Sequence, residues 1–248
     1  MRILFGFLVA ISTVSGSAQG PKSVEITTPG PRNLYGSSGG EWLLGSPILD
    51  VNGSDRGGVL RFAPFVNVQG MLNYDLSDHA GVFIGLSLRN LGFIYDAPDG
   101  FRYKFRTYNA GIPVGFKLGR MHKTLFFAGY ELELPFNYKE KRFANERKED
   151  KFNVWFSDRT EPFFQSVFIG VQGPGKSTLT LRYYLSNFHN TNFKENKNNV
   201  ETRPYAGYNS NLLVVSLGFG LFDGTQRIYR PENTPKDVDA MVPCLPRE

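Results

Sequence analysis

Apolar and polar residues alternate with a period of two along most of the chain beyond about residue 59. In the segment Ser177–Phe188, Leu179 and Leu181 alternate with Thr180 and Arg182. The same alternation recurs over residues 80–89, 108–118, 124–138 and 211–222. Successive side chains of a β-strand point to opposite faces, so this period is typical of strands with one apolar and one polar face. No segment of comparable length shows the 3.6-residue period of an amphipathic helix, and the pattern predicts an all-β fold.

The connections between these segments are of two kinds, which alternate along the chain. Tight polar turns are expected at 75–79, 119–123 and 173–176. Longer hydrophilic connections, which we interpret as exposed loops, are expected at 51–58, 96–100, 139–160 and 190–210. All tight turns then fall at one end of an up-and-down antiparallel arrangement. The segments between them predict eight strands, near 41–50 (which alternates irregularly and contains Pro47), 59–74, 80–95, 102–118, 124–138, 162–172, 177–188 and 211–222.

The two ends of the chain differ in composition from this alternating region. Residues 1–18 combine Arg2, an apolar stretch, and the small residues Gly16 and Ala18, in the order typical of a cleaved secretory signal peptide. Residues 19–40 are rich in Pro, Gly and Ser and are expected to form a linker. We therefore divide the chain into a signal peptide 1–18, a linker 19–40, a barrel 41–222 and a C-terminal tail 223–248.

The composition of the polar face indicates which side of the predicted barrel faces outward. It consists mostly of Gly, Ser, Thr and Asn, which fit the narrow interior of an eight-stranded barrel better than a solvated surface. Its few charges have both signs and would neutralise one another inside a lumen. We assign them to a lumen charge cluster of Arg61, Arg89, Lys117, Glu131, Glu133 and Arg182. The apolar face then contacts lipid, which predicts an eight-stranded antiparallel up-and-down transmembrane β-barrel with a filled lumen.

Three segments, together with the signal peptide, resemble the small outer-membrane β-barrel proteins of Gram-negative bacteria, in particular the eight-stranded outer membrane protein β-barrel domain group of the Bacteroidota. These segments are Tyr108–Leu118, Leu181–His189 and Asn211–Phe222. The resemblance implies a location in the outer membrane, contact with outer-membrane lipid, and insertion by the barrel-assembly machinery. The last strand resembles the terminal strand signal of that group through Leu217, Phe219, Leu221 and Phe222, although this chain continues beyond that point, over residues 223–248.

Composition excludes several other classes of site. The 248 residues include one Cys and no C-x-x-C pair, so neither a disulfide framework nor a structural zinc site is expected. The histidines His79, His122 and His189 are not spaced as metal ligands, and we predict no metal and no cofactor. The net charge is +5, from 28 Lys+Arg against 23 Asp+Glu. Because the two signs are interleaved and the chain is expected to be exported, we predict no nucleic-acid partner.

Residues Gly170–Ser177 match the phosphate-binding pattern G-x-x-x-x-G-K-S literally. That chemistry requires a helix after the loop, whose N-terminal amides face the phosphates. The residues that follow alternate as a strand instead, and Pro174 with its neighbouring glycines predicts a hairpin turn. We therefore expect no nucleotide binding.

A lipid-modifying hydrolase is an alternative function, because the end of one strand resembles the His-x-Ser-Asn motif of lipid A acyl hydrolases with barrel folds. Ser186 and Asn187 match that motif. Tyr184 stands where the motif has His, and His189 follows the serine instead. A nucleophile and its base must lie within hydrogen-bond reach, whereas a spacing of three on a strand places them on opposite faces. We therefore predict a non-enzymatic role in the cell envelope; a small pore and a soluble, lipocalin-like carrier of an apolar ligand are further alternatives.

The segment 139–160 carries the densest run of charges in the chain. It is interpreted either as a solvated loop or as a loop that contacts anionic sugar or lipid phosphates. The candidate residues of this surface loop are Lys139, Lys141, Arg142, Arg147, Lys148 and Trp155. The loops and the tail 223–248, which contains the lone Cys244, are also where an envelope protein partner, such as a surface or secretion assembly, would bind.

Overall fold

The computed structural model describes residues 34–97, 100–121, 123–144, 147–197, 200–222 and 226–227 of the chain. The predicted signal peptide, most of the predicted linker and most of the predicted tail lie outside these residues. The described strands are β1 (Leu34–Val51), β2 (Ser54–Val59), β3 (Arg61–Ala63), β4 (Val68–Asp75), β5 (Ala80–Asp96), β6 (Arg102–Gly119), β7 (Leu125–Ala144), β8 (Arg147–Trp155), β9 (Phe164–Gln172), β10 (Ser177–Tyr184), β11 (Glu195–Lys197), β12 (Val200–Thr202), β13 (Tyr208–Phe219) and β14 (Gln226–Arg227). Among the described residues, no helix is long and apolar enough to span a bilayer.

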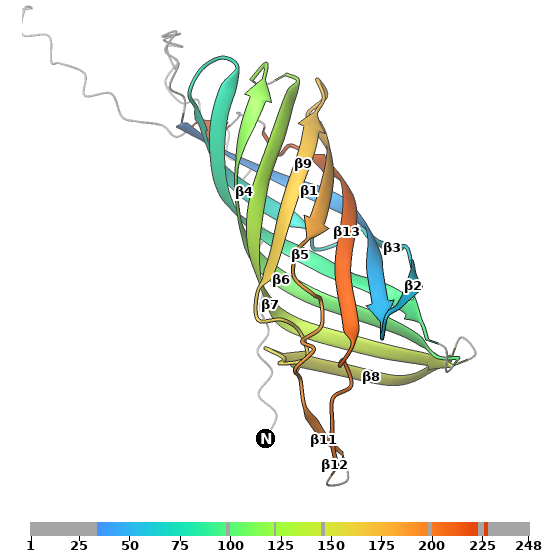
Figure 1. Ribbon diagram of the computed structural model, residues 1–248. Helices are drawn as coiled ribbons and strands as arrows, with labels where there is room; N and C mark the ends of the chain where they lie inside the picture. The colour runs from blue at the N-terminus through green and yellow to red at the C-terminus, as the bar shows by residue number, and fades with distance from the viewer. Residues whose placement is uncertain are drawn as a thin grey trace, which may run out of the picture. The chain divides into compact units, whose positions relative to one another are not determined.

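Eight of these strands form a closed antiparallel ring, in the order β1, β4, β5, β6, β7, β9, β10 and β13 (Figure 1). The ring closes because β1 pairs with β13, from Gly40 opposite Phe219 to Val51 opposite Tyr208. On its other edge β1 pairs in turn with β4, β3 and β2, so these three pieces share one place in the ring. The predicted fold class, an eight-stranded antiparallel β-barrel, is therefore confirmed.

The predicted strand 59–74 is interrupted between β3 and β4. Asn67 fixes the intervening segment by three hydrogen bonds: its Nδ2 donates to the Ala63 carbonyl (2.7 Å), its Oδ1 accepts from the Asn90 amide (2.8 Å), and its own carbonyl accepts from the Glu41 amide (3.0 Å). One residue thus ties the irregular segment to both neighbouring strands, β1 and β5. The interruption is a bulge-like feature that leaves the ring closed.

The first strand begins earlier than the sequence predicts, because residues 34–40 of the expected linker belong to β1. This segment pairs with β4 on one side and, at Tyr35 and Gly36, with β14 on the other, so the start of the predicted tail returns to the barrel. Glycine is needed here for close approach, since a Cβ on Gly39 would meet the Phe219 carbonyl oxygen at 2.5 Å. A composition typical of linkers therefore belongs to a tightly paired strand.

Three of the expected loops contain strands. The segment 51–58 includes most of β2, which pairs back on β1. The charged segment 139–160 is largely a hairpin, in which β7 continues past the barrel wall and β8 pairs back along it. The segment 190–210 contains the smaller hairpin of β11 and β12, which extends below the ring in Figure 1. The sequence did not predict either hairpin, because strands beyond the barrel wall carry no apolar face for lipid and their alternation is hidden among charges.

The barrel wall carries apolar side chains on its outer face. Leu86, in the middle of β5, is 70% exposed, and its outward neighbours on the strand are Ile84 and Leu88. Exposed apolar residues on the other strands include Trp42, Leu44, Phe62, Leu72, Ile112, Val114, Phe116, Leu132, Leu134, Ile169, Leu179, Leu181, Val215 and Leu217. We call this surface the apolar belt. Alternate positions point inward, so the polar face lines the lumen, as the sequence predicts.

Two clusters of buried apolar side chains lie at the two ends of the lumen. The cluster toward the longer loops includes Phe93, Phe105, Phe164, Phe188 and Leu212. The cluster toward the tight turns includes Met71, Phe83, Phe127, Phe168 and Phe222. Charged and polar side chains occupy the lumen between the two clusters.

The glycine pair between β6 and β7 gives a test of how tightly the wall is packed. Gly129 lies opposite Gly115, and a Cβ added to Gly129 would meet the Val114 carbonyl oxygen and Phe168 Cζ. Gly70 on β4 has open space around the same position. We expect Gly129→Ala to lower the free energy of unfolding by about 1–3 kcal/mol and Gly70→Ala to change it by less than about 1 kcal/mol. Urea titration in detergent measures both, and equal unfolding midpoints for the two variants would contradict this packing argument.

Candidate functional site

Arg89, on β5, is the centre of a buried ionic network. Its Nε donates to Glu41 Oε1 (2.6 Å), and its NH1 group forms ion pairs with Glu131 and with Glu133 (3.1 Å). Its NH2 group donates to Gln69 Oε1 (3.0 Å). The Arg89 side chain is 1% exposed, so all of these contacts lie out of bulk water, where each ionic contact is stronger and each unpaired charge more costly.

Arg182, on β10, completes the network from the opposite wall. Its NH1 group lies 2.5 Å from Glu131 Oε2 and 2.9 Å from Ser166 Oγ, and its guanidinium stacks over the Phe168 ring at 4.6 Å. Glu133 accepts further hydrogen bonds from the Tyr184 hydroxyl (2.7 Å) and from Asn109 (2.7 Å).

We call Glu41, Arg89, Glu131, Glu133 and Arg182 the lumen network. It joins three carboxylates and two guanidiniums from four strands.

The structure divides the predicted lumen charge cluster into three places. Four of its six residues belong to the lumen network. Lys117 lies toward the tight turns, where its Nζ contacts Asp75 Oδ1 (2.7 Å) and the Tyr35 hydroxyl (2.5 Å). Arg61 lies toward the loop end and donates to the carbonyl (3.2 Å) and Oδ1 (2.5 Å) of Asn90.

Two acidic members of these sites were not predicted from the sequence. Glu41 falls in the irregular segment 41–50, and Asp75 falls in an expected turn. Both do keep the inward parity of their strands, as their burial shows. The alternation of inward and outward positions, continued from the regular part of each strand, could have identified both residues as inward-pointing.

The lumen network fills the barrel. The residual space beside it, lined by Glu41, Gln69, Phe83 and Arg182 among others, encloses about 10 Å³, which is room for at most about one water molecule. Within the described residues, the middle of the lumen is therefore packed with side chains, as the sequence predicts for a barrel of this width.

The four residues of the predicted terminal strand signal lie in two different places. Leu217 and Phe219 lie on the outer face of β13. Gly220 then turns the chain with φ of 78°, and Leu221 and Phe222 enter the interior instead of continuing the strand. Phe222 is fully buried, and its ring lies 5.2 Å from that of Phe83. The left-handed conformation at Gly220, which glycine adopts without steric cost, is the physical reason that the strand ends at Phe219.

His189 is buried near the loop end within a group of aromatic rings. Its ring stacks on Tyr205 at 4.3 Å and meets Phe105 edge-on at 4.5 Å and Phe188 at 5.0 Å. Within the described residues neither ring nitrogen has a hydrogen-bond partner. Burial, with a smaller contribution from the positive charge of Arg159, lowers the pKa of His189 to about 3, so its imidazole is neutral at neutral pH.

The predicted hydrolase pair is not assembled. Ser186 Oγ accepts a hydrogen bond from the Gln165 amide (3.0 Å), and the two ring nitrogens of His189 form no hydrogen bond to any described residue. A serine nucleophile needs a base within hydrogen-bond reach. Ser186 and His189 therefore do not form a nucleophile–base pair in this structure.

The phosphate-binding pattern Gly170–Ser177 forms a hairpin turn between β9 and β10. The Gly173 amide donates to the Ser177 carbonyl (2.9 Å), and the Lys176 amide donates to the Gly173 carbonyl (3.1 Å). A strand follows the turn, so the helix N-terminus that phosphate binding needs is not there. In the part of the chain that the structure describes, no group of three or more His, Cys, Asp or Glu side chains is placed to hold a metal ion.

The predicted surface loop residues lie on the hairpin of β7 and β8 rather than in a loop. Lys139, Lys141 and Arg142 are on β7, and Arg147, Lys148 and Trp155 are on β8. Arg142 forms an ion pair with Glu149 (3.5 Å), while Trp155 stacks on Phe136 (5.9 Å). Strand pairing holds these positions in fixed register, which a loop would not do.

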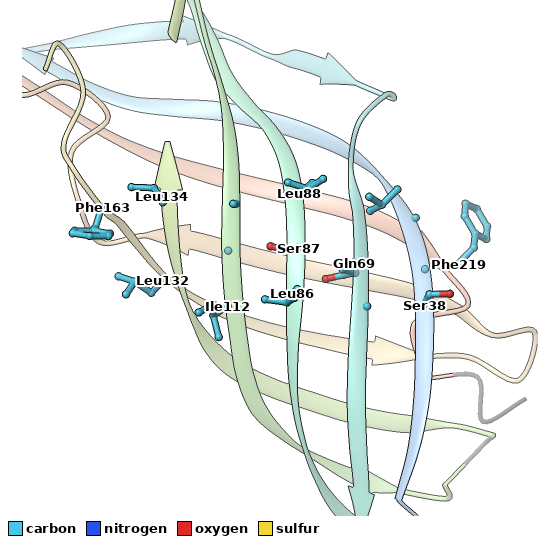
Figure 2. Close-up of a pocket in the computed structure, with 16 residues that line it drawn as sticks. Ser38, Gln69, Leu86, Ser87, Leu88, Ile112, Leu132, Leu134, Phe163 and Phe219 are labelled. Carbon is cyan, nitrogen blue, oxygen red and sulfur yellow. The ribbon is translucent and has the colours of Figure 1, made fainter. Parts of the chain in front are cut away.

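A shallow apolar groove of about 1100 Å³ lies on the barrel wall (Figure 2). It is lined by small residues, among them Gly70 and Ala110, and by larger apolar side chains such as Leu86, Ile112 and Leu134. The groove is therefore a hollow within the apolar belt.

These observations define the class of the protein as an eight-stranded antiparallel β-barrel with an apolar outer wall and an ionic, side-chain-filled interior. Neither a family model nor a curated protein matches the sequence.

Solved structures that are similar include Ail, the attachment invasion locus protein of Yersinia pestis, with 10% identity and a TM-score of 0.37; the match covers 76% of this chain and 97% of Ail. Neisserial surface protein A has 10% identity and a TM-score of 0.36, over 74% of this chain and 96% of its own chain. OprG of Pseudomonas aeruginosa has 10% identity and a TM-score of 0.33, over 76% of this chain and 93% of its own chain. Likeness at this level supports no inference about the function of this chain.

Removing the central guanidinium tests the lumen network. Arg89→Met leaves Glu41, Glu131 and Glu133 buried beside one positive charge fewer, and we expect a loss of about 3–5 kcal/mol in the free energy of unfolding. The control is Arg102→Met, since Arg102 and its partner Asp96 are about half exposed and their ion pair contributes at most about 1 kcal/mol. The stability of each variant is measured as the urea concentration at which half of the folded band on unboiled gels is lost. Similar losses for the two variants would show that the network does not carry the stability assigned to it.

Burial of neutral His189 predicts a pH dependence. The folded-state pKa, about 3, lies below the ordinary value of 6.5, so between these values only the unfolded chain takes up the proton. Stability is therefore full above pH 6.5 and falls as the pH drops, by about 1.4 kcal/mol per pH unit at most. His189→Phe should remove this component, so that its stability advantage over the wild type grows by about 2 kcal/mol between pH 7.5 and 5. Parallel pH profiles for the two proteins would contradict the prediction.

Proposed function

We propose that this chain is an integral outer-membrane protein of a Gram-negative bacterium, exported through a cleaved signal peptide, with a non-enzymatic structural or interaction role in the cell envelope. The observation that carries the proposal is the inversion of the barrel. Apolar side chains such as Leu86, Ile169 and Leu179 are exposed on the outer wall, while the lumen network is buried. A water-soluble barrel has the opposite arrangement, because an apolar surface that surrounds the whole wall is unfavourable in water.

The interior supports a role other than conduction. The lumen network and the two apolar clusters occupy the barrel, and the space beside the network is about the size of one water molecule. A small pore would need a continuous wet path through these side chains. Among the described residues, the space beside the network is too small for the apolar ligand of a lipocalin-like carrier. The separated environments of Ser186 and His189 favour a non-enzymatic role over a hydrolase.

The loop end offers the surfaces for an envelope partner. The β7–β8 and β11–β12 hairpins enclose a cavity of about 300 Å³, lined by Tyr103, Phe152, Arg159, Glu195 and Tyr205 among others. Aromatic and paired charged side chains of this kind are typical of protein contact surfaces. At the other end, the outward residues of β13, which include Leu217 and Phe219, are what the barrel-assembly machinery would engage.

Membrane fractionation tests the proposal directly. The protein should remain in outer membranes after washing with high salt and carbonate, and it should shift on SDS gels between unboiled and boiled samples. Recovery as a soluble protein without such a shift would contradict the assignment of the outer face. Ion conductance across planar bilayers would instead favour the small pore.

A charge placed in the apolar belt distinguishes lipid from water as the surroundings of the wall. Leu86→Arg should lower the free energy of unfolding of the bilayer-inserted protein by about 2–4 kcal/mol, because Leu86 lies near the middle of a spanning strand. Val200→Arg is the matched control, since Val200 is 60% exposed but belongs to the β11–β12 hairpin outside the wall. The measurement is the urea dependence of folding into phosphatidylcholine vesicles, and equal effects of the two substitutions would count against a lipid-facing belt.

A further inference from the structure

Basic side chains lie directly opposite one another where β6, β7 and β8 extend beyond the apolar belt. Lys104 on β6 pairs with Lys141 on β7, and Lys141 pairs with Lys151 on β8. We call these three residues the lysine row. The next pair toward the membrane is also basic, with Arg106 opposite Lys139. Five cations on three adjacent strands thus share one small area of the sheet.

The lysine row faces outward, in the same direction as the apolar belt. Phe105 and Tyr138 are buried in the interior, so their sequence neighbours Lys104 and Lys139 point to the opposite face. Phe152 packs edge-on against Tyr138, which places it on the inner face of β8 and Lys151 on the outer face. The basic residues therefore project sideways from the barrel wall rather than into the cavity at its loop end.

The charges of the lysine row repel one another. Directly opposite like charges destabilise a strand pair. In the part of the chain that the structure describes, no carboxylate forms an ion pair with Lys104, Lys141 or Lys151. Nearby acids are engaged elsewhere: Glu140 accepts from the Tyr138 hydroxyl on the inner face (2.8 Å), and Glu149 pairs with Arg142. Asp150 lines the inner cavity, and its Oδ1 accepts a hydrogen bond from the backbone amide of Lys151 (2.7 Å).

The electrostatics of Lys104 reflect this crowding. Burial lowers its pKa, and the positive charges of Arg61, Lys141 and Arg106 lower it further. An anion bound beside the row would oppose both effects.

The position of the lysine row indicates which anion is available. Immediately toward the belt, Tyr108, Phe136 and Trp155 stack side by side, with ring centroids 6.5 and 5.9 Å apart. Aromatic side chains at the edge of an apolar belt are typical of the membrane–water boundary. Lys104 lies four residues beyond Tyr108, about 13 Å along the strand and less along the membrane normal, because barrel strands are tilted. The row is thus at the height of lipid headgroups, and its long side chains reach toward their phosphates.

We propose that the lysine row is a binding site for the phosphate groups of an anionic lipid in the leaflet at the loop end of the barrel. The proposal rests on the proposed function, since it requires the wall to be embedded in a bilayer. It converts a self-repelling arrangement of lysines into a site that is stable only beside clustered negative charge. It also explains why the hairpin of β7 and β8 holds its basic residues in register.

Quenching of tryptophan fluorescence by brominated lipid tests the proposal. The chain has two tryptophans, Trp42 and Trp155, so Trp42→Phe leaves Trp155 as the only reporter, next to the lysine row. Each lysine near an anionic surface contributes about fivefold. In mixed vesicles, brominated phosphatidylglycerol should therefore associate near Trp155 more strongly than brominated phosphatidylcholine, by about fivefold if one lysine is engaged and by about 100-fold if all three are. The preference should decrease as the salt concentration rises.

The variant with Lys104→Gln, Lys141→Gln and Lys151→Gln should lose this preference and remain heat-modifiable on gels. A matched triple variant, Arg120→Gln, Lys123→Gln and Lys176→Gln, removes the same charge at the tight-turn end and should keep it. Equal quenching by the two lipids in the Trp42→Phe protein would overturn the lipid site while leaving the membrane assignment intact. An equal loss of the lipid preference in both triple variants would do the same. Quenching by neither lipid, without heat modification, would overturn the proposed function itself.

Discussion

Because the outer wall of the barrel is apolar, its charged side chains must point into the interior, away from bulk water. The guanidinium of Arg89 lies there. An unpaired charge there would cost several kcal/mol, so the lumen has to be neutralised by its own residues. Glu41, Glu131 and Glu133 meet this requirement for Arg89, and Arg182 shares Glu131 from the opposite wall. Because the partners come from β1, β5, β7 and β10, the network is complete only when the ring of strands has closed.

This constraint separates the barrel into a structural middle and a functional end. In the part of the chain that the structure describes, side chains of both signs fill the middle of the lumen. The strands that continue past the apolar belt present a different surface. There the inward positions around Tyr205 carry aromatic residues and charged residues of both signs, whereas the outward positions around Lys141 are basic. One hairpin, β7–β8, thus presents two chemically distinct faces.

The period of two, together with the alternation of tight and long connections, was sufficient to predict the strands and their antiparallel arrangement, because burial of a strand face is a strictly local pattern. The direction of the two faces came instead from the small and polar residues of one face, which suit a narrow lumen. Its failures have specific causes. Residues 34–40 resemble a linker because close strand pairing there requires glycine, and the β7–β8 hairpin was taken as a loop because it lies outside the lipid. The pattern did not predict which lumen residues contact one another. Parity placed Lys117 and Arg89 in the same lumen, but it did not show that they lie at different depths. The inward path of Phe222 depends on a single left-handed residue, Gly220, which alternation does not reveal.

The seal that Phe222 forms has a kinetic consequence. On the tight-turn side its ring, with those of Phe83 and Phe127, covers the polar lumen, and on the loop side Phe93, Phe105 and Phe188 form a second cover. Protons and water between these two covers can exchange with solvent only when one aromatic layer moves, so exchange there reports local opening rather than solvent access. Phe222, at the end of the barrel, therefore helps to determine how slowly protons in the lumen exchange with solvent.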